Sequence, residues 1–205
     1  MNTEQPGLRE RKKQETRNAL SWATIRLVVE RGLDAVRVED IAAEVGVSPR
    51  TFNNYFASKG EAIAARHQER ARQIAVELRA RPEAEPLWEA ITHAVLARFG
   101  LAEGTGEREP AQQWLDGVRL MVSEPALQGE LRKAVAAAEA EFAAAVAERT
   151  GTDVERDLYP KLVAAAVGAA MTTAIGHWLH ASEPVPMAPL LRDALHQLAT
   201  GLPTP

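Results

Sequence analysis

The feature that most constrains this chain is a short junction, Gly46-Val47-Ser48-Pro49, between two brief segments with apolar residues at helical spacing. Glycine readily takes the left-handed conformation that ends a helix. Serine is a good N-cap, and proline fits the first helical position because its missing N–H would have no partner there. The junction therefore predicts one helix ending at Val45 and a second beginning at Pro49. Two short helices joined by a tight glycine turn are typical of a helix-turn-helix.

The flanking segments complete a helical module. In the preceding segment, apolar residues recur on one helical face and predict a helix over residues 10–30, which Gly32 would end in the left-handed conformation: Leu20, Ala23, Thr24, Leu27 and Val28. After the junction, the second short helix ends at Tyr55, because Ser58 and Glu61 have the spacing of a capping box that starts another helix. The first sixty residues thus predict three helices followed by a capped fourth.

The second short helix carries polar side chains of a size that fits a DNA groove. Phe52 and Phe56 lie four residues apart and are expected to face inward. The other positions include donors and acceptors that can read base edges: Arg50, Thr51, Asn53 and Asn54. The alternative is an ordinary three-helix surface whose polar side chains have no function. Such a surface would not need a second helix that is so short and so well capped. We therefore predict docking on DNA.

The charge distribution is compatible with this prediction, although the whole chain carries a net charge of −4. Residues 1–60 hold ten basic and eight acidic side chains, whereas the remainder holds fourteen and twenty. The basic excess is concentrated in a predicted N-terminal arm: Arg9, Arg11, Lys12, Lys13 and Arg17. Screening confines charge interactions to about 10 Å, so a basic arm on an acidic body can still engage phosphates. By itself, such a cluster is more often a solvated helix start.

Composition and patterning favour an all-α fold, because alanine and leucine dominate and alternating β-branched runs are scarce. We expect a helix-turn-helix domain over residues 1–60 and a larger helical domain over residues 61–205. Beyond the fourth helix, which runs to about Ala80, helices are predicted at 86–99, 110–122, 125–149, 157–181 and 186–199. The longest apolar run, 162–175, is shorter than the roughly 18 residues of a membrane span. We interpret it as a buried or helix-pairing segment and expect no membrane partner.

The N-terminal module closely resembles that of TetR-family transcriptional regulators over residues 10–63, without a gap. The resemblance rests on four short motifs taken together: Asp40-Ile41-Ala42, Gly46-Val47-Ser48, Tyr55-Phe56 and Ser58-Lys59. It implies that the third helix enters the major groove with four residues facing bases: Pro49, Arg50, Thr51 and Asn53. It implies phosphate contacts for four more: Ser48, Asn54, Tyr55 and Lys59. Arg17 would approach the neighbouring backbone or minor groove, and Tyr55 has an alternative role in packing.

One position departs from the family pattern. Val38 stands where TetR-family proteins usually have a threonine that caps the second helix and can touch phosphate, which puts that contact in doubt.

The resemblance also implies homodimerisation through the last two helices and recognition of double-stranded DNA at a palindromic operator. Small residues that let helix backbones approach closely support such pairing: Ala164, Ala165, Gly168, Ala169 and Thr172. Bulk would come from a second set: Trp178, Leu190, Leu191, Leu195 and Leu198. An intramolecular core is the alternative for these residues.

Two helices and two further residues are predicted to enclose a small-molecule effector: Trp88, Ile91 and Val95 on one helix, Trp114, Val118 and Met121 on another, with Phe142 and Met171 closing the space. Such residues at helical spacing are more often plain core, and the pocket follows from the resemblance. Residues 121–127 and the alanine-rich helix after them also resemble an actinobacterial TetR subgroup with acyl-CoA-like ligand binding, which includes regulators of the mycofactocin type. This implies a hydrophobic or acyl-CoA-like effector, and the family's commoner habit is repression.

Two other functions compete with this interpretation. An enzyme would need a catalytic or metal constellation, but His177 and His180 have ligand spacing without a neighbouring carboxylate, and no Ser-His-Asp arrangement is supported. We predict no enzyme, no metal and no cofactor. The chain contains no cysteine, which excludes disulfides and fits the cytoplasm. The second alternative is a DNA-binding protein without an effector.

Overall fold

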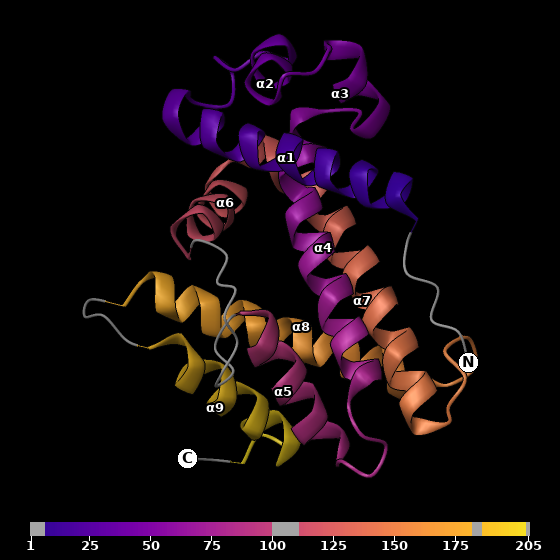
Figure 1. Ribbon diagram of the computed structural model, residues 1–205. Helices are drawn as coiled ribbons and strands as arrows, with labels where there is room; N and C mark the ends of the chain where they lie inside the picture. The colour runs from indigo at the N-terminus through magenta and orange to yellow at the C-terminus, as the bar shows by residue number, and fades with distance from the viewer. Residues whose placement is uncertain (1–6, 100–110, 182–185, 204–205) are drawn as a thin grey trace. The chain divides into compact units, whose positions relative to one another are not determined.

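The computed structural model describes residues 7–99, 111–181 and 186–203, and all regular structure within them is helical (Figure 1). The elements follow one another as α1 (Leu8–Arg31), α2 (Val38–Val45), α3 (Pro49–Tyr55), α4 (Lys59–Ala80), α5 (Leu87–Arg98), α6 (Ala111–Ser123), a 3₁₀ turn η1 (Pro125–Leu127), α7 (Gln128–Thr150), α8 (Leu158–Leu179) and α9 (Met187–Ala199). The predicted all-α fold is confirmed.

The chain divides into two compact units. The first unit combines residues 1–67 with residues 109–134, and the second combines residues 68–108 with residues 135–205. Helices α4 and α7 therefore contribute residues to both units. This division does not coincide with the predicted boundary at residue 60, because α6 and the start of α7 pack into the same core as the helix-turn-helix.

The ends of the short helices follow their local sequence. Gly46 ends α2 with φ 72° and ψ 33°, the left-handed conformation expected there. Gly32 was also expected to be left-handed, but it has φ 86° and ψ 154°, an extended conformation that glycine tolerates and other residues rarely adopt. The predicted basic arm is itself helical from Leu8 onward, so its side chains project from the first turns of α1.

The start of α4 uses the predicted serine and a variation on the capping box. The hydroxyl of Ser58 accepts a hydrogen bond from the backbone N–H of Glu61 at 3.0 Å. The Glu61 carboxylate accepts from the N–H of Ala57 at 2.6 Å, one residue before the expected position. Both groups still satisfy donors that the helix leaves without partners.

The core of the first unit holds α3 by its aromatic side chains. Phe52 and Phe56 are fully buried, as predicted, with ring centroids 5.7 Å apart. They pack with Leu20 of α1, Ile41 of α2 and Ile63 of α4. Figure 1 shows α1 beside α2, with α3 following across the turn. One face of α3 is thereby fixed inward, which leaves its other faces available.

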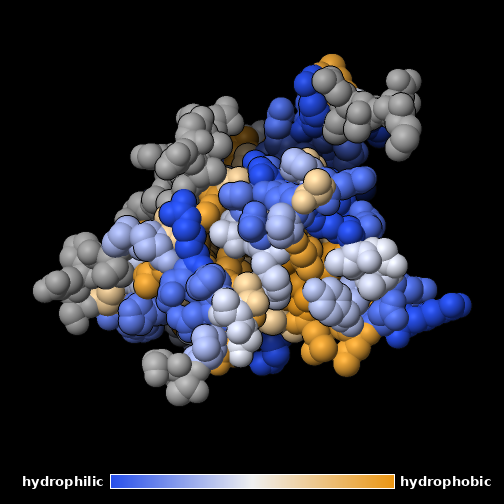
Figure 2. Space-filling view, turned by 90° about the horizontal axis from the view of Figure 1, so that it is seen from below, coloured by the Kyte–Doolittle hydropathy of each residue, from blue (hydrophilic) through white to orange (hydrophobic). Residues whose placement is uncertain are grey.

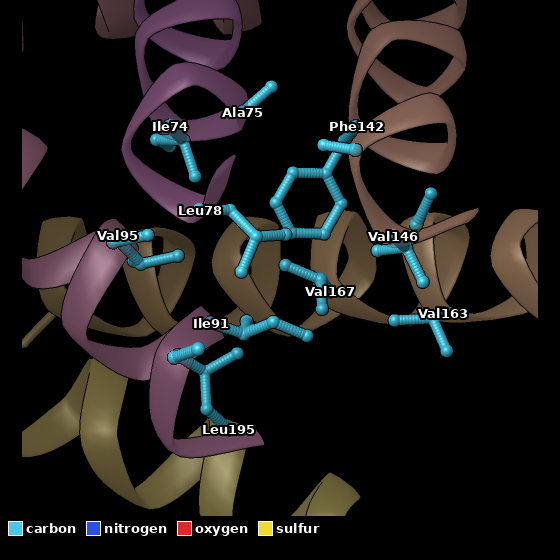
Figure 3. Close-up of a cluster of buried hydrophobic side chains, with 14 of the residues drawn as sticks. Ile74, Ala75, Leu78, Ile91, Val95, Phe142, Val146, Val163, Val167 and Leu195 are labelled. Atoms are coloured by element: carbon cyan, nitrogen blue, oxygen red, sulfur yellow. The ribbon is translucent and has the colours of Figure 1, made fainter. Parts of the chain in front are cut away.

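The second unit has its own core, in which α9 packs against α8 and α5. Figure 3 shows Leu78, Ile91, Phe142 and Val167 pointing toward one another from four helices. Within α9, Leu191 and Leu195 are also fully buried in this core. Their predicted role in pairing is therefore wrong, because side chains already enclosed within one copy cannot contact another.

Helix α8 combines a buried face with an exposed apolar one. By length and composition alone α8 could cross a membrane, as could core helices of soluble proteins, yet only 22% of its apolar 18-residue stretch is buried. Val163 and Val167 lie in the core, whereas Leu158 and Leu162 are 68% and 55% exposed. Figure 2 shows apolar surface among hydrophilic side chains on the viewed face of the protein. Exposed apolar side chains that lie close together on one helix, here Leu158, Tyr159 and Leu162, indicate a surface that another molecule covers.

Polar contacts within the second unit fasten the connection between α4 and α5. Arg149 of α7 donates to the carbonyl oxygens of Arg81, Pro82 and Glu85, at 3.2, 2.5 and 2.7 Å. The Arg81 guanidinium binds both oxygens of the Glu85 carboxylate at 2.7 and 2.6 Å, and Nδ1 of His93 lies 2.6 Å from one of them. Arg149 thus holds the backbone of the linker, and the Glu85 carboxylate joins the side chains of Arg81 and His93.

We expect this linker to give the second unit an acid-sensitive stability. Hydrogen bonds from Arg81, and secondarily from His93, lower the pKa of Glu85 to about 2, although burial opposes this shift. A carboxyl whose pKa is depressed by folding stabilises the protein above its ordinary value near 4.5, and this contribution is lost as the pH falls toward 2. Thermal unfolding of wild type and Glu85→Gln should therefore differ most above pH 5 and converge below it. An unchanged difference across that range would contradict the assignment.

Candidate nucleic-acid interface

Helix α3 presents polar side chains on the faces opposite its buried phenylalanine. Pro49, Arg50, Asn53 and Asn54 are exposed, and Thr51 is half-buried. Over the seven residues of α3, the exposed side chains are one guanidinium, two amides and one proline ring. These groups offer both donors and acceptors, which is the chemistry needed to read base edges in a major groove.

The hydroxyls at the start of α3 already have partners. Ser48 caps the helix by accepting a hydrogen bond from the N–H of Thr51 at 3.1 Å, and the two hydroxyl oxygens lie 2.9 Å apart. Each hydroxyl has further hydrogen-bonding capacity, because it combines one donor with two acceptor sites. The cap therefore fixes the geometry of the first turn while Ser48 stays exposed.

Two of the predicted contact residues lie against the aromatic core of the module. The Arg17 guanidinium carbon lies 5.0 Å from the centre of the Phe56 ring, a cation–π arrangement that ties α1 to the end of α3. Tyr55 is half-buried, and its ring centroid lies 6.5 Å from that of Phe56. Both residues therefore contribute to packing while part of each side chain stays accessible.

The side chain of Lys59 lies in a different place from the other predicted contacts. Its ammonium donates to the carbonyl oxygens of Leu33 at 2.5 Å and of Val36 at 2.7 Å. These carbonyls belong to the loop between α1 and α2. The structure thus brings Lys59 to the backbone just ahead of α2.

Sequence reasoning missed the polar ties that hold α2. The carboxylate of Asp40 accepts from the N–H of Arg37 at 2.9 Å and so satisfies a donor at the start of α2. An ion pair between Arg26 of α1 and Glu44 of α2 joins the two helices. Asp40 belongs to the recognised motif and could have been read as a cap. The Arg26–Glu44 pair has no local signal, because its partners are 18 residues apart. At the position that departs from the family, Val38 packs against the core of the first unit.

The predicted effector residues are distributed over both units. Ile91, Val95 and Phe142 are buried in the core of the second unit, and Trp88 and Met171 pack against it. Met121 is buried in the core of the first unit, and Val118 is half-buried on the same helix. Trp114 lies on α6, and its side chain is outside the described part of the structure. Six residues of α1 and α6 line a separate hollow of about 240 Å³ in the first unit, and none of them belongs to the predicted effector set.

The described residues contain no group of three or more histidine, cysteine, aspartate or glutamate side chains that could hold a metal ion. What they do contain is a compact helix-turn-helix with an exposed recognition helix. The fold and this surface define a helix-turn-helix protein that binds DNA.

Comparison with known protein families gives the particular class. Residues 22–65 match the model described as bacterial regulatory proteins of the TetR family, and residues 85–203 match the model of the MftR C-terminal domain. The chain belongs to the TetR family of DNA-binding transcriptional regulators, a family that is not enzymatic. The resemblance seen at both ends of the sequence is confirmed.

Related proteins agree with this assignment. The chain is 31% identical over 161 residues to the HTH-type transcriptional regulator TcmR of Streptomyces glaucescens, covering 78% of this chain and 71% of that protein. A TetR-family regulator from Syntrophomonas wolfei has a TM-score of 0.66 at 18% identity, covering 94% of this chain and 98% of that one. Thermus thermophilus FadR, a repressor solved with lauroyl-CoA, has a TM-score of 0.57 at 20% identity, covering 92% and 96%. The two structures share the fold.

Proposed function

We propose that this regulator binds a palindromic operator as a homodimer and represses adjacent genes until a hydrophobic or acyl-CoA-like effector releases it. The observation that carries the proposal is the division of α3 into a buried aromatic face and an exposed face with Arg50, Asn53 and Asn54. Pro49, Arg50, Thr51 and Asn53 would face bases, with Arg50 as a bidentate donor to guanine. Ser48, Asn54, Tyr55 and Arg17 would contact the backbone. A regulator of this kind acts in the cytoplasm, where its DNA is.

The exposed face of α8 supports the proposed homodimer. Leu158, Leu162, Ala165, Ala169 and Thr172 are all exposed, and their alternating spacing of four and three residues forms one stripe along the helix. The Thr172 hydroxyl donates to the carbonyl oxygen of Gly168 at 2.9 Å, so it brings no unpaired donor into a contact. The small residues that follow the two leucines, Ala165, Ala169 and Thr172, let two copies of α8 approach closely. A two-fold dimer would then present two recognition helices to the two halves of a palindrome.

The proposed effector class rests on the matched domain family and on a fold relative. Residues 85–203 match the MftR C-terminal domain, and the FadR structure from Thermus thermophilus holds lauroyl-CoA. Such a ligand can release DNA only if it binds the released conformation better than the DNA-bound one. The effector residues proposed are those of the second unit, Trp88, Ile91, Val95, Phe142 and Met171. Trp114, Val118 and Met121 belong to the first unit and are left out of the proposed site.

The proposal is tested by salt-dependent binding of the purified protein to the DNA that flanks its own gene. We expect binding that is tighter than to random DNA and that weakens steeply as salt is raised. Lauroyl-CoA added to that complex is expected to reduce operator affinity, with coenzyme A alone and lauric acid alone as controls. Binding that no acyl-CoA alters would remove the effector part and leave a DNA-binding protein without this ligand. A genome-wide selection that returns no preferred sequence would contradict the proposal that the protein recognises a specific operator.

A further inference from the structure

Lys59 joins two segments that lie on either side of the helix pair α2–α3. The residue opens α4, directly after α3, and its ammonium reaches the carbonyl oxygens of Leu33 and Val36, directly before α2. The partners are 26 and 23 residues apart in sequence. One side chain therefore closes the whole helix-turn-helix segment into a loop.

The loop between α1 and α2, which Lys59 holds at two carbonyl oxygens, has an apolar anchor as well. The side chain of Val36 is almost completely buried, and Leu33 packs against the same core. Apolar contact is non-directional and leaves the orientation of a backbone loosely determined. Hydrogen bonds from an ammonium group to two carbonyl oxygens are directional and are stronger than bonds between neutral groups. Lys59 thus fixes the backbone of a loop whose side chains are fixed by the core.

The position of this loop matters because the helices that follow it are short. Helix α2 has eight residues and α3 has seven, and helices of this length are marginal without tertiary contacts. Their buried anchors are Ile41 and Ala42 in α2 and Phe52 in α3. The direction in which α3 projects therefore depends on how the ends of the segment are held.

We propose that Lys59 is a positioning residue of the DNA-binding module, whose ammonium clamps the α1–α2 loop to the start of α4 and so sets the orientation of α3. This role replaces the phosphate contact that the family resemblance implies for this side chain. The inference rests on the proposed docking of α3 on DNA, but the clamp itself is a property of the free protein. It can therefore be tested with and without an operator.

The first test replaces Lys59 with methionine, which keeps the length of the stem and removes the charge and the donors. In Lys59→Met we expect the backbone amides of residues 33–38 to exchange hydrogen faster in the free protein. Operator affinity should fall about tenfold, the scale of a lost hydrogen bond to a charged group. The slope of log affinity against log salt should not change. Loss of a phosphate contact would instead reduce that slope by about 0.9.

Two further variants sharpen the result. Lys59→Arg keeps the charge and the donors, so it should recover most of the hydrogen-exchange protection of the loop. Lys133→Met removes an exposed lysine of the same unit, whose ion pair with Glu130 lies at the surface, and should change neither exchange nor affinity. A reduced salt slope in Lys59→Met with normal exchange in the loop would overturn the proposal.

A measurement on the wild-type protein decides the question even if Lys59→Met fails to fold. An ammonium held by two carbonyls exchanges its protons slowly, so nitrogen-detected NMR should show the Lys59 side chain in the free protein. Its resonance should persist unchanged when operator DNA is added. A signal that appears only with DNA would assign the side chain to a phosphate and overturn the clamp. A signal in the free protein would support the clamp even if no operator were bound.

Discussion

Replacing Leu162 and Ala165 with glutamate is expected to convert the proposed dimer to a monomer. Both residues lie on the exposed stripe of α8, and Leu162 is 55% exposed within one copy. In a two-fold interface each substitution occurs twice, and each substituted residue faces the same residue of the partner or a near neighbour of it. A buried charge without a partner costs about 3–5 kcal/mol. The dimer dissociation constant should therefore rise at least about 100-fold.

Sedimentation velocity over a range of protein concentrations measures this change. Val76→Glu is the matched control, because Val76 is an exposed apolar residue on α4, outside the stripe. Operator affinity should fall together with dimerisation in the α8 variant and stay normal in the control. A variant that remains dimeric with a native circular dichroism spectrum would place the dimer contact elsewhere.

Arg50→Ala is expected to lower the discrimination between operator and random DNA by roughly ten- to hundredfold. A bidentate contact from arginine to guanine is worth about 1–3 kcal/mol against a wrong base, and each 1.4 kcal/mol corresponds to a factor of ten. Because Arg50 is exposed on α3, removal of its side chain should leave folding unaffected.

Fluorescence anisotropy with operator and scrambled duplexes at several salt concentrations measures this discrimination. Arg132→Ala, which removes an exposed arginine on α7, controls for the lost charge. Equal weakening on both duplexes, with a smaller salt slope, would show that Arg50 binds phosphate and that base recognition lies with other residues of α3.

The limits of the short helices could be predicted from the sequence because their signals are local. Gly46, Ser48 and Pro49 end one helix and start the next through contacts within a few residues. Helix α2 ends at the predicted Val45, and α3 has both predicted bounds. The inward face of α3 followed from the spacing of Phe52 and Phe56. The later helices deviate from their predicted ends by only one or two residues, apart from the first turn of α7, which is a separate 3₁₀ turn.

Tertiary structure decided which of several apolar or charged partners a residue would meet. Leu191 and Leu195 have the spacing of a pairing helix, but only packing against α5 and α8 shows that they are enclosed within one copy. The inclusion of α6 in the first unit has the same origin, since the side chain of Ile25 lies against Gly117 far along the chain.

Lys59 illustrates the same division within the DNA-binding surface. The family resemblance implied a phosphate contact for this residue in the first turn of a helix. Its partners are carbonyls of a loop more than twenty residues earlier, and backbone carbonyls carry no sequence signal. Local hydrogen bonding and periodicity thus determined the helices and their ends. The meeting of distant backbone and side-chain groups, which depends on how the core closes, determined what the functional residues touch.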